Sequence, residues 1–232
     1  MHIYLIEWIP PARTGGLVGL DQCSQAISEC IDGRISREQK GTRLFLIGHS
    51  LGETLAAIYS AREPHAIRRL LLLDAPLCFQ PATSQFRDAL VSMVPPDLAK
   101  MTVVPGSLLS HASAFASPRT FTWSRLADAA ASLDDRRLST FTLELSAGRS
   151  TKRRFLAGSS IRFWNGSIEK INFCRGILTV LGRKIGPSDL DLPILAVIDA
   201  ADEVAPLASI EPLLEALPTK DVSLIKYPGE TA

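Results

Sequence analysis

Five short, nearly continuous apolar runs stand out along the chain. Each has the length of a strand and shows little alternation with polar residues, the pattern of parallel strands that are covered on both faces. Stretches with apolar residues at helical spacing lie between several of them, as over residues 23–31 and 210–217. We therefore expect an α/β fold with one parallel sheet flanked by helices. The five expected strands cover residues 3–9, 43–47, 67–74, 194–199 and 222–227.

The alternation of strands and helices stops between about residues 76 and 193. This stretch is too long for an ordinary loop, and it contains helix-prone segments at 86–94 and 123–133. The sequence therefore predicts a core formed by residues 1–76 and 193–232, with a mostly helical cap inserted at 77–192. Residues 141–172 are rich in arginine, serine and glycine without clear periodicity. We expect them to be the poorest-packed part, as either a divergent cap or a frame-shifted segment.

The second apolar run ends in the sequence Gly48-His49-Ser50-Leu51-Gly52, followed by a helix-like segment. This G-x-S-x-G pattern between a strand and a helix is typical of a nucleophile elbow, a tight turn that exposes the serine hydroxyl. A tight turn of this kind requires glycine, or nearly so, at both flanking positions. The competing interpretation is an ordinary capping box formed by Ser50 and Glu53. We expect Glu53 to be tolerated as a charged residue at the helix N-terminus.

The composition narrows the possible functions. The chain holds 25 Lys and Arg against 24 Asp and Glu, so it lacks the basic surface that nucleic acids require. The four cysteines show neither metal-ligand nor disulfide-framework spacing, and we expect free thiols in the cytoplasm. The sequence shows no signal peptide and no apolar run long enough to span a bilayer. We expect no metal and no cofactor, and the oligomeric state stays open.

Four segments resemble the α/β-hydrolase superfamily, and more narrowly its polyhydroxyalkanoate synthase-like branch. They are Tyr-Leu-Ile-Glu-Trp-Ile-Pro-Pro at 4–11, Gly-His-Ser-Leu-Gly at 48–52, Leu-Leu-Asp-Ala-Pro-Leu at 72–77 and Asp-Glu-Val-Ala-Pro at 202–206. The resemblance implies a serine acyl-transfer enzyme that is an ester or thioester hydrolase or an acyltransferase, with a small acyl ester or acyl thioester as substrate. Polyester synthases carry cysteine as the nucleophile, so a serine favours hydrolysis over polymerisation.

The same resemblance implies individual roles. Ser50 matches the nucleophile, the Leu51 amide matches one oxyanion donor, and Gly48, His49 and Gly52 complete the elbow. Asp202 matches the acid that orients a catalytic histidine. Asp199 is the alternative acid, and either aspartate could instead be a strand-end residue that binds local amides.

The histidine of the triad has no counterpart in the sequence. In this superfamily it follows the last strand, yet no histidine follows His111. His49 should point away from Ser50, and His111 is the one histidine placed to reach the site from the cap. The chain also begins inside what resembles the fourth strand, so we expect a chain shortened at both ends. The alternative function is therefore a catalytically inactive truncated hydrolase-like protein, or an acyl-ligand-binding remnant.

Overall fold

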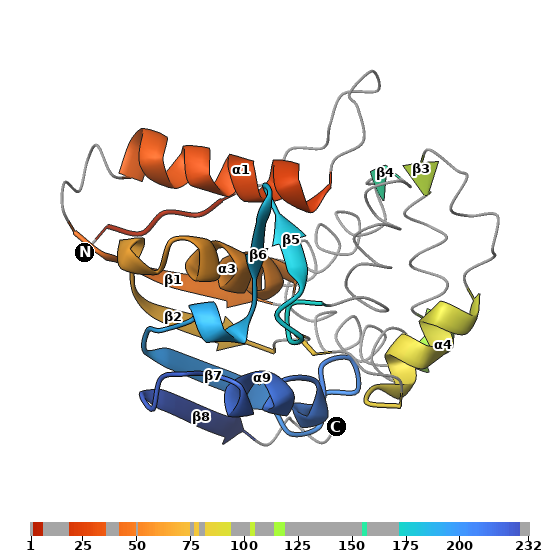
Figure 1. The fold of residues 1–232 in the computed structure, drawn as a ribbon. Helices are drawn as coiled ribbons and strands as arrows, with labels where there is room; N and C mark the ends of the chain where they lie inside the picture. Colours follow the sequence, from red (N-terminus) through yellow and green to blue (C-terminus); the bar gives the residue numbers. More distant parts are fainter. Residues whose placement is uncertain are drawn as a thin grey trace, which may run out of the picture.

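A four-stranded parallel sheet forms the centre of the computed structural model, with the strand order β1-β2-β7-β8 (Figure 1). Its strands are β1 (Leu44–His49), β2 (Ile67–Leu73), β7 (Ile194–Asp199) and β8 (Val222–Tyr227). Four of the five expected strands are thereby confirmed, and so is the parallel α/β arrangement. The structure describes residues 2–6, 19–35, 42–49, 51–74, 77–78, 82–93, 103–104, 114–118, 155–156 and 172–227.

The first expected strand is wrong over the residues that the structure describes. Residues 2–6 form no strand, and 7–9 lie outside the described residues. The side chains of Ile3 and Leu5 are 81% and 92% exposed, whereas Tyr4 and Ile6 pack against the core. A continuous apolar run predicts burial of both faces, but here only every second side chain is covered. Residues 3–6 thus follow the surface of the core without joining the sheet.

Helices cover one face of the sheet. The helix α3 (Leu51–Arg62) lies between the strands and α1 (Leu20–Cys30), which continues into the π-helical turn η1 (Ile31–Ile35) (Figure 1). Every residue from 53 to 61 is buried, because α3 is enclosed on both sides. The expected helical stripe at 210–217 forms the short helix α9 (Glu211–Glu215), which the 3-10 turn η6 (Leu207–Ser209) precedes. The short turn η2 (Pro64–Ala66) links α3 to β2.

An antiparallel hairpin, β5 (Leu178–Val180) and β6 (Arg183–Ile185), packs beside α1 and α3. Both residues of its turn have positive φ, 48° at Leu181 and 77° at Gly182, which suits a two-residue hairpin. The Arg183 Nη1 atom donates to the carbonyl oxygen of Arg62, 3.0 Å away, at the end of α3. The turn η5 (Pro187–Asp189) then leads to β7.

The described part of residues 77–192 also contains α4 (Gln85–Met93) and the short antiparallel pair β3 (Val103–Val104) and β4 (Phe155–Leu156). The helix expected at 86–94 is confirmed as α4. The helix expected at 123–133 lies outside the described residues, as does nearly all of 141–172. The division into a core and a mostly helical cap therefore stays a prediction.

Two of the four cysteines are joined in the structure, contrary to the expectation of free thiols. Cys78 and Cys174 form a disulfide across a sequence separation of 96, while Cys23 and Cys30 are free. Spacing along the sequence could not reveal this pair, because residues far apart in the chain meet only in the fold. The bridge joins the beginning of the expected cap to the segment that leads into β5.

We expect alkylation of the denatured, unreduced chain to modify two cysteines, Cys23 and Cys30. Reduction before alkylation should raise the number to four, because the disulfide would then release Cys78 and Cys174. Peptide mass spectrometry with and without reductant measures both numbers. Four modified cysteines without reductant would show that the bridge is not formed.

The face of the sheet opposite these helices carries exposed apolar side chains on its two edge strands. Alternate residues point to it, and the large apolar side chains of Phe45, Ile47 and Ile225 are 60%, 59% and 49% exposed. The alternating residues of β1, Leu46 and Gly48, point to the helix-covered face and are more buried. Among the described residues, no helix has the length and apolar character needed to cross a membrane.

Candidate active site

The turn between β1 and α3 is built around Gly48. A Cβ atom added to Gly48 would collide with the Cα of Glu53 and would lie 2.7 Å from the Glu53 nitrogen and 2.8 Å from the Gly52 oxygen. These are backbone atoms of the first turn of α3, which cannot move without moving the helix. Glycine is therefore required at residue 48 so that the helix can start against the end of the strand.

The second glycine of the motif has a different environment. A Cβ atom added to Gly52 would meet nothing within 4 Å, so the expected need for glycine fails at this position. Ser50 itself lies outside the described residues. The expected closeness of Ser50 to Asp202 or Asp199 therefore stays a prediction. Leu51 is the first residue of α3, so its backbone amide belongs to the helix N-terminus, where amides can bind an anion.

His49 and Asp74 lie together at the carboxyl edge of the sheet. His49 ends β1 and Asp74 directly follows β2, and 4.0 Å separate His49 Nε2 from Asp74 Oδ2. Asp74 has a left-handed backbone with φ of 58°, which an aspartate tolerates better than most residues. Its Oδ1 atom accepts a hydrogen bond from the Asp199 amide at 3.1 Å, and the Tyr227 hydroxyl lies 3.4 Å away. The ends of all four strands thus meet at Asp74.

Asp202 lies in the loop after β7. Its Oδ1 atom accepts hydrogen bonds from the backbone amides of Val204 at 2.6 Å and Ala205 at 3.1 Å. Burial raises the pKa of the Asp202 carboxyl, the two amides lower it, and the negative charges of Asp74 and Asp199 raise it further. The net direction is upward, because burial is the largest of these effects. The loop therefore holds the carboxyl in a fixed position within an acidic environment.

Asp199, the alternative acid, is the last residue of β7 and is partly buried. Its Oδ1 atom accepts the amide of Ala201 at 2.8 Å, and its carbonyl oxygen accepts the amide of Asp202 at 3.2 Å. These bonds are typical of an aspartate that shapes the turn after a strand. Asp202 is also bound by local amides, so hydrogen bonding alone does not separate the two candidates.

Glu53 is the unexpected member of this region. Its side chain is fully buried, and within the described part of the chain neither carboxyl oxygen has a hydrogen-bond partner. Burial, and after it the negative charge of Asp74, raises the pKa of Glu53 from 4.5 to about 10. The carboxyl is therefore neutral at pH 7, and the expectation of a tolerated charge at the helix N-terminus is wrong.

Two serines tie the region of the expected cap to the Asp202 loop. The Ser84 hydroxyl donates to the carbonyl oxygen of Glu203 at 3.1 Å, and the Ser117 hydroxyl donates to Glu203 Oε2 at 2.6 Å. Both serines are buried. Segments that are more than eighty residues away in the sequence thus hold the loop of the proposed acid from one side.

Sequence reasoning assigned no role to Asp74, Tyr227 or the buried state of Glu53. Asp74 could have been found, because it follows the apolar run next to the elbow strand, and adjacent parallel strands end at the same edge. The same reasoning could have identified Tyr227, because it is the last residue of its strand. The burial of Glu53 had no signal in the sequence.

Comparison with solved structures supports the class of fold that this geometry indicates. A soluble variant of monoglyceride lipase from Saccharomyces cerevisiae matches with a TM-score of 0.55 and 13% identity, over 95% of this chain and 64% of that chain. A hydrolase from Pseudomonas aeruginosa PA01 matches with a TM-score of 0.51 and 18% identity, over 92% of this chain and 65% of that chain. The fold is that of the α/β-hydrolases.

The family follows from the sequence. The model described as "Serine aminopeptidase, S33" matches residues 12–231, and the chain belongs to this family of α/β-hydrolases. The poly(3-hydroxyalkanoate) polymerase subunit PhaC of Allochromatium vinosum is 25% identical over 237 residues, and that of Thiocystis violacea is 23% identical over 236. Each alignment covers 98% of this chain but 64% of the relative. The expected resemblance to the superfamily and to its polyhydroxyalkanoate synthase-like branch is confirmed.

Proposed function

We propose that this chain is a serine acyl-transfer enzyme that forms an acyl intermediate on Ser50. The observation that supports it most directly is the tight turn after β1: β1 ends at His49 and α3 begins at Leu51, and a Cβ on Gly48 would collide with the backbone of α3. A serine in such a turn lies beside the helix N-terminus, where the Leu51 amide can stabilise the oxyanion that develops during attack. The proposed substrate is a small acyl ester or acyl thioester.

Asp202 is the proposed acid of the site. It belongs to the loop at the carboxyl edge of the sheet, the same edge at which β1 runs into the turn. Its fixed, partly buried carboxyl suits a group that orients an imidazole and stabilises its charged form. Asp199 is the alternative acid.

The names of the relatives narrow the substrate class further. The two bacterial relatives are polymerase subunits for poly(3-hydroxyalkanoate), and the yeast neighbour is a monoglyceride lipase. All three names refer to chemistry at acyl esters. Because the proposed nucleophile here is a serine, we favour hydrolysis over polymer growth.

The second candidate function is a catalytically inactive hydrolase-like protein that binds an acyl ligand. It is favoured by the absence of any histidine after His111 in these 232 residues. Of the described histidines, His49 lies beside Asp74, and His2 and His65 are exposed. A serine hydroxyl without a base near neutral pKa is a weak nucleophile.

The test is to trap an acyl group on the protein. We expect prolonged incubation with p-nitrophenyl butyrate to release p-nitrophenolate and leave one butyryl group on the peptide that contains Ser50, because a good leaving group lets even slow attack without a base accumulate an adduct. The group should persist, because water also needs a base to release it. A Ser50→Ala variant should stay unmodified, and peptide mass spectrometry detects the difference. No adduct, or one spread over many serines, would support the inactive alternative and overturn the enzyme proposal.

Steady-state turnover should be low in these 232 residues. Loss of one triad member costs on the order of 10⁴ to 10⁶ in rate, so Ser50→Ala should change turnover of the chromogenic ester very little. High activity that Ser50→Ala abolishes would show that a base is present. Loss of that activity in His111→Ala as well would identify His111 as the base.

A cytoplasmic location stays a prediction from the sequence. The disulfide between Cys78 and Cys174 would be unusual in a reducing compartment. Alkylation of cysteines in intact cells, before lysis, measures the redox state that the protein has there.

A further inference from the structure

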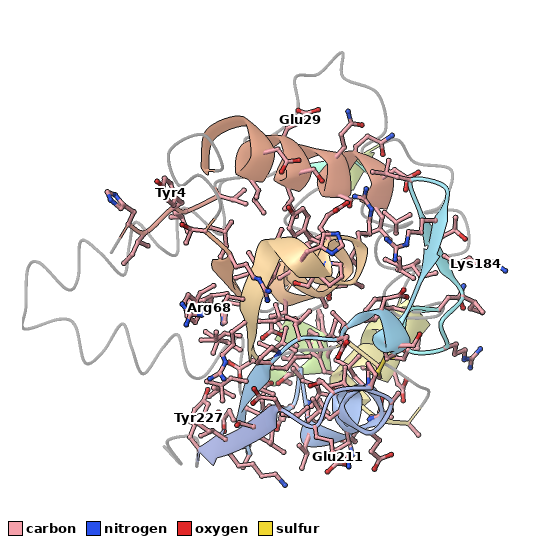
Figure 2. All side chains as sticks on the ribbon, turned by 60° about the vertical axis from the view of Figure 1, so that its left-hand side comes forward. Tyr4, Glu29, Arg68, Lys184, Glu211 and Tyr227 are labelled. Carbon is pink, nitrogen blue, oxygen red and sulfur yellow. A yellow bond between two sulfur atoms is a disulfide. The ribbon has the colours of Figure 1, made fainter. Side chains whose placement is uncertain are left out.

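The loop that carries Asp202, residues 200–206, is contacted by the segment that follows β2. The loop leads from β7 toward α9, and Figure 1 shows α4 beside the carboxyl ends of the strands. In Figure 2, Glu211 of α9 lies on the opposite side of the molecule from Glu29 of α1. The loop is thus on the α4 side, where Ser84, the residue before α4, reaches it.

Two peptide groups of this loop bind the Asp202 carboxylate. The amides of Val204 and Ala205 both donate to Asp202 Oδ1, at 2.6 and 3.1 Å. The carbonyl oxygens of the same two peptide groups belong to Glu203 and Val204, because a peptide group joins one carbonyl to the next amide. Each group is planar and trans, so its C=O and its N–H point in opposite directions. A group that holds the two oxygens therefore also aims the two amides at Asp202.

The Ser84 hydroxyl lies at both of these oxygens. It donates to the Glu203 carbonyl oxygen at 3.1 Å, and the Val204 carbonyl oxygen is 3.4 Å from Ser84 Oγ. A hydroxyl has one proton, so the shorter contact makes the Glu203 carbonyl the main acceptor. Ser84 is 2% exposed, and its own carbonyl oxygen accepts the Asp88 amide at 3.0 Å in the first turn of α4. The donor is therefore fixed in place and shielded from water.

We propose that Ser84 is the positioning residue of the acid, because its hydroxyl holds the peptide groups whose amides bind Asp202 Oδ1. A hydrogen bond to the C=O of a peptide group also polarises the N–H of that group and strengthens the bond that it donates. The inference rests on the proposed function, in which Asp202 is the acid. Ser84 acts on Asp202 only through the backbone of the loop.

The two amide bonds matter because the other surroundings of Asp202 disfavour its ionised form. Burial raises the pKa of the Asp202 carboxyl, the two amides of the loop lower it, and the negative charges of Asp74 and Asp199 raise it. An acid that orients an imidazole and stabilises its charged form must itself be ionised. Ser84 thus supports the interactions that favour the charged carboxyl.

The test compares Ser84→Ala with the matched control Ser117→Ala. Both serines are buried, and each donates its hydroxyl to the same loop. The Ser117 hydroxyl, however, binds the side chain of Glu203 at Oε2, whereas the Ser84 hydroxyl binds the backbone. The two changes therefore remove the same group, and they differ in whether a peptide oxygen loses its donor. Circular dichroism checks that both variants are folded.

The first readout is hydrogen exchange of single amides, measured by NMR. In Ser84→Ala the Val204 amide should exchange at least about threefold faster, because its hydrogen bond is weakened. The Ala205 amide should change less, since its peptide oxygen has the longer contact with Ser84. The Ala201 amide, which donates to Asp199 at 2.8 Å, is the internal reference and should not change. Ser117→Ala should leave the Val204 amide close to its original rate.

The second readout is the titration of the Asp202 carboxyl, followed by NMR of its side-chain carbon. Ser84→Ala should raise the pKa of Asp202, because the weakened amide bonds lower it less. Ser117→Ala should raise it less. A measurement on the unchanged chain needs no variant: the Ser84 hydroxyl proton should exchange slowly enough to be observed and should lie close to Glu203. A hydroxyl signal merged with that of water would contradict the proposal.

The outcomes separate this inference from the proposed function. Equal effects of Ser84→Ala and Ser117→Ala would overturn the role of Ser84, and so would a Val204 amide and an Asp202 pKa that ignore Ser84→Ala. None of these readouts involves Ser50. A chain that fails to acquire an acyl group would overturn the proposed enzyme and leave these measurements unaffected.

Discussion

Replacing Gly48 with alanine should destabilise the protein by about 3 kcal/mol, or prevent its folding, because overpacking against rigid atoms is costly. The added Cβ would collide with the Glu53 Cα and approach the Glu53 nitrogen and Gly52 oxygen, all in the backbone of α3. A side chain could rotate away from such a clash, but the first turn of a buried helix cannot. Urea unfolding at neutral pH, followed by circular dichroism, measures the loss.

Gly52→Ala is the matched control for this prediction. A Cβ at Gly52 meets nothing within 4 Å, and the residue lies in the helix α3. Alanine is favoured over glycine in a helix by roughly 0.5–1 kcal/mol, so this variant should be as stable as the unchanged chain or slightly more so. Equal losses in the two variants would contradict the steric role of Gly48 and, with it, the geometry on which the proposed nucleophile elbow depends.

Glu53→Gln should become increasingly more stable than the unchanged chain as the pH rises from about 4.5 toward 10. Burial, with a contribution from Asp74, raises the pKa of Glu53 from 4.5 to about 10 in the folded protein. Between these values the unfolded chain loses the proton while the folded chain keeps it. The unfolded state therefore binds fewer protons, and the stability of the unchanged chain falls with rising pH.

Glutamine cannot ionise, so the variant lacks this contribution to the pH dependence. Because each pH unit between the two pKa values corresponds to about 1.4 kcal/mol, the difference in unfolding free energy should reach about 5 kcal/mol at pH 8 and be small near pH 4.5. Glu215→Gln, at an exposed glutamate of α9, serves as the control and should leave the slope unchanged. A Glu53→Gln slope equal to that of the unchanged chain would show that Glu53 is not held neutral by the fold.

The sequence predicted the strands β2 and β7, whose apolar side chains are buried on the face that the helices cover. Leu70, Leu72, Ile194 and Ala196 are at most 2% exposed, and their strands were found within one or two residues of their bounds. The prediction failed at residues 3–6, because a run of apolar letters does not tell whether one face or both are covered. The sequence did not reveal the exposed apolar side chains of β1 and β8 for the same reason.

The candidate site was predictable as far as local chemistry determines it. Glycine at 48 and the helix that follows could be read from the motif, and Asp202 lies in a loop at the expected edge of the sheet. The meeting of Asp74 with His49 and Tyr227 depends on the order β1-β2-β7-β8, which a single sequence does not state. The burial of Glu53 depends on the enclosure of α3 from both sides, a property of the whole packing.

The bridge between Cys78 and Cys174 has a consequence for the covalent topology of the molecule. A single backbone cut anywhere between these residues would leave two fragments, one carrying β1, β2, α1 and α3, the other carrying β7 and β8. The disulfide would keep both fragments in one molecule, and the pairing of β2 with β7 would hold the sheet together. The chain is therefore a natural candidate for a split protein whose halves separate only when a reductant and a denaturant are both present.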